Sequence, residues 1–289
     1  MRLRDEVTKA GEELAEKIGA TAIIIISPQA RQIRESLKTR LPVIIARVDG
    51  VAARPGDASV DLFTRMTPDV DRESVFLKVS RIELMSEAIE AAYIQGLIQD
   101  RIVLGIVSIG DTHSVIVVDI TDIPFIKKIA DLTATLDYTI IKATLNLAIE
   151  IAREGREGKL IGTAFVVGDT DNVLKRSHQL ILNPYEGHPK DARDIRDENN
   201  WETVKEFAQL DGMFIVDEKG YIRAAARYID ASVRGVEMLP GKGGRHLAAA
   251  AITRYTKSVA ITVSGSGGMI TVYQGGHEVL KLNPRISIT

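Results

Sequence analysis

A run of β-branched residues near the N-terminus constrains the fold more than any other feature of the chain. The segment Ala22-Ile-Ile-Ile-Ile-Ser27 places apolar side chains at consecutive positions, so both faces of a strand formed here must be covered. Further apolar runs of strand length lie at 42–48, 75–79, 103–108 and 114–120. Segments with helical periodicity lie at 2–18, before the first run, at 28–39, between the runs at 22–27 and 42–48, and at 83–99, between the runs at 75–79 and 103–108. This alternation predicts an α/β domain with a parallel sheet over residues 1–122.

A second domain is predicted over residues 123–289, after the boundary signal Thr121-Asp-Ile-Pro124. Its expected helices lie at 125–155, 171–182 and 201–209. Its expected strands lie at 162–168, 213–216, 222–227, 259–264, 269–273 and 278–282. The charged stretch 189–200 between two of the helices reads as a solvated loop.

Composition narrows the class of protein. The chain has 289 residues, 45% of them hydrophobic and 26% charged, which is typical of a globular protein with a substantial core. A formal net charge of −2 gives no support for nucleic-acid binding. The chain has no cysteine, which excludes disulfides, thiolate metal sites and thiol nucleophiles. No apolar run is long enough to span a membrane, and the N-terminus is charged, so we expect a cytoplasmic protein with no membrane partner.

The segment Leu239-Pro-Gly-Lys-Gly-Gly-Arg-His246 is followed directly by a leucine and four alanines. Alanine is the strongest helix former, so the glycines and cations lie at a predicted helix N-terminus. Free backbone N–H groups, the positive end of the helix dipole, and Lys242, Arg245 and His246 together suit phosphate binding. The segment does not fit a P-loop, because Gly235 is one residue too far from Gly241-Lys242 and Gly243 stands where that motif has a hydroxyl residue. The alternative is a flexible turn that merely precedes a core helix.

A second candidate site is Leu210-Asp-Gly-Met-Phe-Ile-Val216, where a carboxylate immediately precedes a buried strand. Gly212 is expected to leave room for a ligand beside Asp211, although Asp-Gly is also a common turn signal. A carboxylate at a strand edge suits a divalent metal, and the glycine-rich helix start suits phosphates. Together they indicate attack at a nucleotide phosphorus.

From about residue 125 to 289 the chain resembles the diadenylate cyclase domain family, which joins two ATP molecules into cyclic di-AMP. The motifs that carry the resemblance occur in the family's order: Ser177-His-Gln-Leu-Ile-Leu-Asn-Pro-Tyr-Glu-Gly187, Phe207-Ala-Gln-Leu-Asp-Gly-Met213, Gly244-Arg-His246 and Val263-Ser264. The resemblance implies a central mixed, twisted sheet flanked by helices. It also implies release of two pyrophosphates at a site formed between two facing subunits, hence at least a homodimer.

The resemblance also implies roles for individual residues. Asp211 would bind Mg²⁺ or Mn²⁺ and help to activate the ribose 3′-hydroxyl, while Arg245 and His246 would hold the phosphates. The other residues implied to contact the nucleotide are Gly212, Met213, Tyr228, Ile229, Gly243, Gly244 and Ser264. Tyr228 and Ile229 would wall the adenine, and the alternative for Tyr228 is ordinary packing on an edge strand. Lys242 is expected to be peripheral.

Three positions depart from the family's signatures. Met213 replaces an alanine, Leu247 replaces an arginine, and Gly265 replaces a glutamate that many members carry. These departures motivate an alternative function, a cyclase-like domain that binds ATP or cyclic di-AMP as a sensor without making the product. Retention of Asp211 together with Arg245 and His246 favours the enzyme.

The N-terminal domain resembles, more weakly, the C-terminal α/β domain of pyruvate kinase. The residues that carry this resemblance are Ala20-Thr-Ala-Ile-Ile-Ile-Ile-Ser27, Ala30-Arg31 and Leu41-Pro-Val-Ile-Ile45. It implies a regulatory or oligomerising module, and the alternative is a plain structural domain. Asp111 and His113 are interpreted as solvated residues of a turn rather than as a metal pair.

Overall fold

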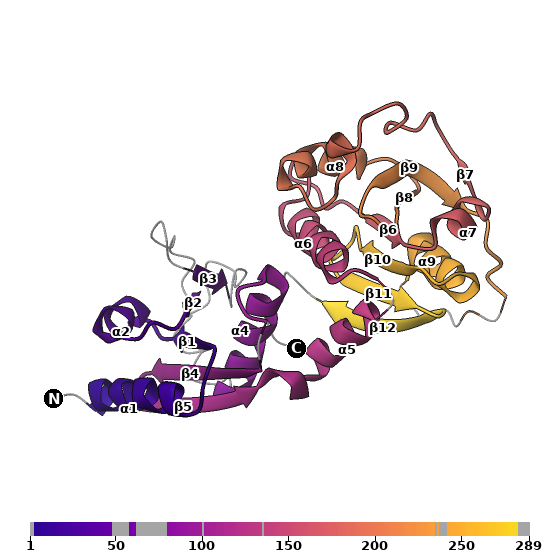
Figure 1. The fold of residues 1–289 in the computed structure, drawn as a ribbon. Helices are drawn as coiled ribbons and strands as arrows, with labels where there is room; N and C mark the ends of the chain where they lie inside the picture. The colour runs from indigo at the N-terminus through magenta and orange to yellow at the C-terminus, as the bar shows by residue number, and fades with distance from the viewer. Residues whose placement is uncertain are drawn as a thin grey trace. The chain divides into compact units, whose positions relative to one another are not determined.

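The computed structural model describes residues 3–47, 58–61, 80–99, 101–134, 136–234, 236 and 242–282. The chain divides into two compact units, which meet along the sequence between Lys127 and Lys128. We call them the N-terminal unit and the C-terminal unit (Figure 1).

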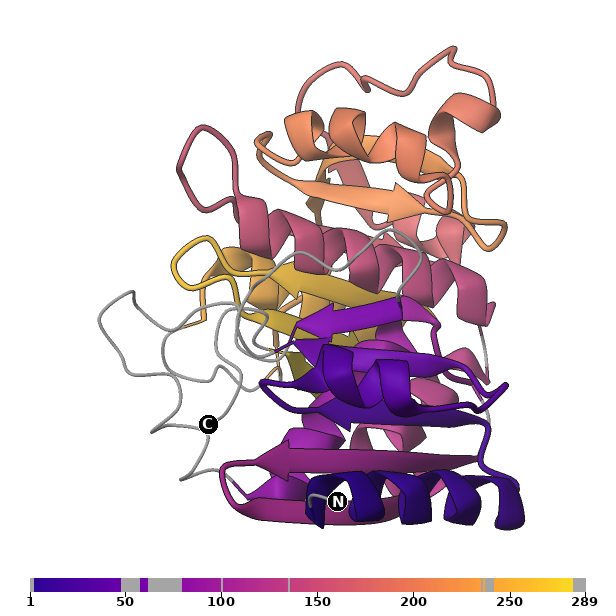
Figure 2. The same ribbon diagram turned by 90° about the vertical axis from the view of Figure 1, so that its left-hand side faces the viewer.

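The N-terminal unit is a five-stranded sheet with helices on both faces (Figure 1). Its elements are α1 (Leu3–Lys17), β1 (Ala22–Ile26), α2 (Ala30–Ser36), β2 (Val43–Arg47), β3 (Ala58–Asp61), α4 (Arg81–Gln95), β4 (Ile102–Ile109) and β5 (Thr112–Asp119). The strand order is β3-β2-β1-β4-β5. Figure 2 shows the strands side by side, with α1 along β4 and β5.

The apolar run that constrained the fold becomes the central strand β1, whose five residues are all buried. Ile23 and Ile25 pack in one cluster with Ala15 of α1 and Ile33 of α2. On the other face, the side chain of Met85 from α4 packs directly over Gly105 of β4, in the space that a β-carbon would occupy. The predicted α/β architecture is confirmed.

The prediction of a wholly parallel sheet is wrong at one edge. Strands β1 to β4 pair in parallel, but β5 runs antiparallel to β4 over eight residue pairs. Only Gly110 and Asp111 separate these two strands, and Gly110 has φ of 58°. A two-residue connection makes a hairpin, whereas a parallel pair needs a long crossover. Strand β3 was not predicted, and the strand predicted at 75–79 lies outside the described residues.

The C-terminal unit is built on a seven-stranded sheet of order β12-β11-β10-β6-β8-β9-β7. Its helices are α6 (Tyr138–Glu154), α7 (Thr170–Leu174), α8 (Trp201–Phe207) and α9 (Gly244–Tyr255), and α5 (Pro124–Thr133) crosses the boundary between the units. Its strands are β6 (Thr163–Val167), β7 (Ser177–Gln179), β8 (Met213–Val216), β9 (Ile222–Ile229), β10 (Val259–Val263), β11 (Ile270–Gln274) and β12 (His277–Leu282). Short 3-10 turns occur at Ile120–Asp122, Asp191–Arg193 and Glu198–Asn200.

The predicted mixed sheet of this unit is confirmed. Strands β6 and β8 pair in parallel, while every other neighbouring pair is antiparallel. Helices α6 and α9 cover opposite faces of the sheet (Figure 1). The small alanine side chains of α9 let this helix lie close to β10 and β11, and Ala249 and Ala250 are buried there.

Two predicted helices are corrected. The expected helix at 125–155 is two helices, because Asp137 starts a new one by accepting a hydrogen bond from the backbone N–H of Thr139 at 2.7 Å. The expected helix at 171–182 ends at Leu174, where its carbonyl accepts a hydrogen bond from Arg227 at 3.1 Å. The chain then forms β7, which pairs with β9.

Candidate functional site

Three segments that are far apart in the sequence reach the same edge of the C-terminal sheet. Strands β6 and β8 are parallel, with Phe165 opposite Phe214, so the residues before each strand share one edge. Strand β10 is antiparallel to β6, with Val263 opposite Thr163, so the residues after β10 reach that edge too. We call this the β8 edge. It brings together the segments that contain Gly162, Asp211 and Ser264.

Asp211 and Arg245 meet at the β8 edge. The Arg245 guanidinium donates a hydrogen bond to Oδ1 of Asp211 at 3.2 Å, and this ion pair joins the start of β8 to the first turn of α9. The Asp211 side chain is 94% exposed and that of Arg245 is 35% exposed. The carboxylate therefore remains available to a ligand from solvent.

Gly212 has a different role from the one expected. A β-carbon on Gly212 would lie 2.7 Å from the carbonyl carbon of Ala226 and from the amide nitrogen of Arg227, and φ is 101°. Backbone of β9, rather than a ligand, occupies the space that the missing side chain leaves free. Glycine is required here because the chain passes close to β9 in a conformation that other residues rarely adopt. This contact fixes the point at which Asp211 enters the β8 edge.

The N-terminus of α9 is open. The helix begins at Gly244, and its cap residue Gly243 offers no side-chain hydrogen bond. Among the residues that the structure describes, none accepts a hydrogen bond from the backbone N–H of Gly244 or Arg245. β-Carbons built on Gly243 and Gly244 would meet nothing within 4 Å. Exposed donors at the positive end of a helix are suited to an anion. Gly241 lies outside the described residues.

His246 is tied to the sheet beneath α9. Its Nδ1 lies 3.0 Å from the hydroxyl of Tyr273 and 3.1 Å from that of Thr262. The Lys242 ammonium donates to the Tyr273 hydroxyl at 3.0 Å and forms an ion pair with Glu278. Burial, and then the positive charge of Lys242, lowers the pKa of His246 from its ordinary value of 6.5, so the ring is neutral near pH 7.

The sequence interpretation of Lys242 as peripheral missed this network. Tyr273 and Glu278 come from strands that follow α9 in the chain, and only their pairing in the sheet places them beside His246. The glycine-lysine-glycine sequence of the turn was the one signal available, and it does not indicate which residues the lysine contacts.

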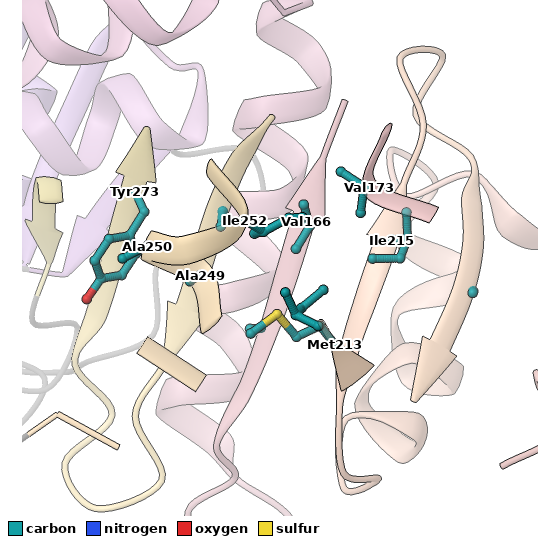
Figure 3. Packing of buried hydrophobic residues seen from close by; sticks show 12 residues of the cluster. Val166, Val173, Met213, Ile215, Ala249, Ala250, Ile252 and Tyr273 are labelled. Carbon is teal, nitrogen blue, oxygen red and sulfur yellow. The ribbon is translucent and has the colours of Figure 1, made fainter. Parts of the chain in front are cut away.

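Two residues expected to contact the nucleotide have buried side chains. Met213 is 3% exposed and Ile229 is 7% exposed, and both belong to the apolar cluster beneath α9. Figure 3 shows Met213 within this cluster, together with Ala249 of α9. Packing accounts for both side chains, so the contact expected of them would have to come from their backbone.

Tyr228 has the exposure that a ligand-facing ring needs. It is 54% exposed on β9, and its ring centroid lies 5.3 Å from that of His178 on β7. His178 Nδ1 in turn lies 2.9 Å from a carboxylate oxygen of Asp230. These contacts hold an aromatic pair on the surface near the end of β9 where β8 begins.

The glycine turn after β10 explains one departure from the family's signature. The hydroxyls of Ser264 and Ser266 lie 3.1 Å apart. A β-carbon on Gly265 would lie 3.2 Å from the backbone nitrogen of Gly162, so the two turns pack closely. A larger residue at this position would need a small shift of the Gly162 backbone. Leu247, the other departure on α9, is half-buried, and its N–H donates to the Gly243 carbonyl at 3.4 Å.

A second cluster of charges joins α6 and α8, and its ion pairs include no predicted site residue. Three carboxylates, Glu150, Glu154 and Glu202, lie close enough together to resemble a metal site. The ammonium of Lys205 occupies the centre, 2.6 Å from Glu150 and 2.9 Å from Glu154, and it also pairs with Glu202. Burial opposes the charge of Lys205, but the three carboxylates together raise its pKa. A lysine thus takes the place that a cation would need.

In the N-terminal unit, His113 Nδ1 forms a hydrogen bond with the hydroxyl of Ser108 at 2.8 Å across the β4–β5 hairpin, and Asp111 is exposed in the turn.

Across the described part of the chain, no helix is both long enough and apolar enough to cross a membrane.

Two family models match parts of this chain. Residues 150–278 match the family model described as "DisA bacterial checkpoint controller nucleotide-binding", and residues 6–121 match the model described as "Probable sensor domain DacZ_A". The second of these matches lies within the N-terminal unit, and the first lies within the C-terminal unit.

Two curated proteins are similar to this chain. A diadenylate cyclase of Methanocaldococcus jannaschii is 40% identical over 183 residues, which cover 62% of this chain and 58% of that protein. A diadenylate cyclase of Haloferax volcanii is 36% identical over 148 residues, which cover 51% of this chain and 54% of that protein. This chain spans somewhat more than half of the length of these relatives.

A solved structure, DacA from Staphylococcus aureus in a double-mutant form, is similar over 49% of this chain and 86% of that one. The identity is 18% and the TM-score is 0.34.

Proposed function

We propose that this protein is a diadenylate cyclase, which condenses two ATP molecules into cyclic di-AMP and releases two pyrophosphates. The observation that carries the proposal is the Asp211–Arg245 pair beside the open N-terminus of α9. It places a solvent-facing carboxylate within contact of an anion-binding helix end, which is the combination that a metal-bound triphosphate requires.

The donor set at the β8 edge fits a divalent ion that is shared with substrate. Asp211 presents one exposed carboxylate, and Mg²⁺ is commonly held by one or two carboxylates together with substrate phosphates. We assign Asp211 as the protein ligand for Mg²⁺ or Mn²⁺. When bound, such an ion would neutralise charge on the triphosphate and favour ionisation of a nearby hydroxyl.

The remaining roles follow from position. In each transfer, the 3′-hydroxyl oxygen of one ATP bonds to the α-phosphorus of the other. The bond from that phosphorus to the bridging oxygen breaks, pyrophosphate leaves, and the hydroxyl proton is lost. Arg245, His246 and the N–H groups at the start of α9 would stabilise the charge that develops on the phosphates. Ser264 would add a hydroxyl donor from the turn after β10, and Tyr228 would stack on adenine.

Two subunits are part of the proposal, because each ATP supplies the nucleophile for the other. Two copies of the β8 edge would face each other about a two-fold axis, each supplying half of the reacting site. We propose a sensing or oligomerising role for the N-terminal unit, supported by the family match of residues 6–121.

The test is incubation of the full chain with ATP and Mg²⁺ or Mn²⁺, followed by chromatography for cyclic di-AMP. Asp211→Asn should lower the rate at least about a hundredfold, because it removes the metal ligand. Asp191→Asn is a matched control, since this exposed aspartate lies on a distant 3-10 turn. Product formation that is unchanged in Asp211→Asn would refute the assignment. Binding of ATP or cyclic di-AMP by the wild type without any product would favour the sensor instead.

The two-subunit site has its own test. Wild-type chains co-expressed with an excess of Asp211→Asn chains should make less product per wild-type subunit, because most facing pairs then contain a damaged half. Co-expression with Asp191→Asn chains should cause no such loss. If the rate per wild-type subunit did not depend on the added variant, each subunit would be acting alone.

A further inference from the structure

The contacts of His246 determine which of its ring nitrogens carries the proton. Tyr273 has one hydroxyl hydrogen, and its hydroxyl has two close partners, Lys242 Nζ and His246 Nδ1. A lysine ammonium can only donate, so the Tyr273 oxygen accepts from Lys242, and Nδ1 is the acceptor within reach of the Tyr273 hydrogen. Nδ1 is therefore an unprotonated acceptor, and the proton of the neutral ring is on Nε2.

Thr262 is compatible with this assignment. Its hydroxyl lies 3.1 Å from Nδ1 and 3.2 Å from the Thr271 carbonyl, and with an unprotonated Nδ1 its single hydrogen has these two acceptors. Thr262 and Tyr273 are both buried, at 0% and 4% exposure, so water does not readily replace these partners. A protonated Nδ1 would compete with the Tyr273 hydrogen and leave it without an acceptor in the described part of the chain.

Lys242 enforces the direction of the Tyr273 hydroxyl. The ion pair with Glu278 of β12 holds the lysine, and Glu278 is also paired with Lys281 at 2.7 Å. The positive charge turns the lone pairs of the tyrosine oxygen toward the lysine and its hydrogen toward the histidine. The chain Glu278–Lys242–Tyr273 thus connects the edge of the sheet to the first turn of α9.

The Nε2 side of the ring remains available. No described residue forms a hydrogen bond with Nε2, and the side chain is partly exposed. His246 lies two residues after Gly244, on the same turn as the unpaired backbone N–H groups of α9. A fixed Nε2–H therefore adds a directed, neutral donor to an existing anion-binding helix end.

We propose that Lys242 and Tyr273 are positioning residues, which hold the proton of His246 on Nε2 so that this nitrogen donates a hydrogen bond to a phosphate oxygen of the bound nucleotide. The phosphate part of this inference rests on the proposed function, whereas the position of the proton does not. This role would account for the convergence of Lys242 and Tyr273, which come from different parts of the chain, beside His246. Among the described residues, His246 itself forms no ion pair.

Nitrogen-15 NMR of histidine-labelled full-length protein tests the position of the proton without substrate. Long-range proton–nitrogen correlations distinguish the two neutral tautomers, and His246→Gln assigns the resonance among the five histidines. The wild type should show the Nε2-protonated pattern. Tyr273→Phe should mix the tautomers, because Nδ1 loses its donor. Lys281→Met is the matched control, since it touches Glu278 but not Tyr273, and it should leave the pattern unchanged.

The pH titration of the same resonance separates positioning from simple packing. Lys242→Met should raise the pKa of His246, because a nearby positive charge is removed, and Glu278→Gln should lower it, because a negative charge is removed. Lys281→Met should raise it less than Lys242→Met does, and Tyr273 is the remaining titratable group against the ring. Opposite shifts would show that both charges act on the His246 ring, and the tautomer pattern of Tyr273→Phe tests the positioning role.

Substrate contact is tested with an α,β-methylene analogue of ATP. Binding should shift the Nε2 resonance in the wild type, and Tyr273→Phe should lower the rate of cyclic di-AMP synthesis roughly tenfold, which corresponds to the loss of one hydrogen bond to a charged group. A wild-type ring protonated on Nδ1, or a Tyr273→Phe ring still fixed on Nε2, would overturn the positioning role. An unmoved Nε2 resonance on binding would overturn the phosphate contact. Failure of the wild type to make product would count against the proposed function alone, because the tautomer is read without substrate.

Discussion

The C-terminal unit contains two clusters of charged side chains that differ in how fully their members are paired. Between α6 and α8, Lys205 is 3% exposed and contacts three carboxylates. At the β8 edge, Asp211 is 94% exposed and contacts Arg245 alone among the described residues. The first cluster has more acidic residues, yet the second has the free bonding capacity.

This difference shows that a group of acidic residues does not by itself indicate a ligand site. A buried lysine among carboxylates neutralises them, and removal of either partner would leave a charge without compensation. An exposed carboxylate beside an uncapped helix end has unused acceptors and donors, which a metal-bound phosphate can satisfy. We therefore expect changes at the β8 edge to affect activity and changes around Lys205 to affect stability.

The largest expected effect is on activity at the β8 edge. Arg245→Met removes the cation from the first turn of α9, and the rate of cyclic di-AMP synthesis should fall roughly a hundredfold, as for loss of a positioned charge-stabilising group. The melting temperature should change little, because Arg245 forms a single pair with a fully solvated partner. Chromatography of product and thermal melting, measured on the same preparation, check both parts. A large fall in melting temperature would remove the contrast between the clusters.

A smaller effect is expected from Lys205→Met, and it should change stability rather than activity. It leaves three carboxylates without their cation, and because these are partly exposed the cost should be about 2 kcal/mol. For a unit of this size that lowers the melting temperature by roughly 4–8 °C, while activity per folded molecule is retained. Lys175→Met, at an exposed lysine on the end of α7, is the control and should shift neither quantity. Loss of activity in a folded Lys205→Met protein would mean that this cluster serves the reaction.

The smallest expected effect is a change in the shape of the stability curve with pH. Hydrogen bonds from Lys205 and then Arg156 lower the pKa of Glu202 below its ordinary value of 4.5 in the folded state. Its contribution is therefore present above that value and is lost as pH falls through the folded pKa. The raised pKa of Lys205 gives the reverse, a contribution that is present below 10.5 and lost at higher pH. Melting temperatures measured from pH 3 upward should show a shallower acid decline in Lys205→Met than in wild type, and parallel curves would contradict the pairing.

Much of the fold could be predicted, because a strand that is buried on both faces consists of consecutive apolar residues. The run at 22–27 predicted the central strand β1, and the alanine-rich run predicted α9. Strand β7 could not be predicted in this way. Its three residues form a strand only because β9 offers them a partner and Arg227 bonds to the carbonyl at the end of α7. The strand β5 was predicted, but its antiparallel direction was not, because the turn between β4 and β5 decides that direction.

The candidate site shows the same division. The sequence placed Asp211 before a strand and Arg245 at a helix start, and chemistry alone suggested that they belong together. Their contact at 3.2 Å depends on the order of strands, which no local pattern contains. The reason for Gly212 was misjudged because the neighbouring backbone of β9 lies across the sheet rather than along the chain.

The sequence by itself determined the α/β class, the positions of most strands and helices, and the chemical character of a glycine-rich, basic helix start and of a carboxylate before a strand. These properties follow from residue type and short-range periodicity. The tertiary structure alone decided which charged groups are already satisfied and which remain open, and it alone joined Lys242 and Tyr273 to His246. Those facts depend on distances between side chains from different strands, and such distances are fixed only when the sheet assembles.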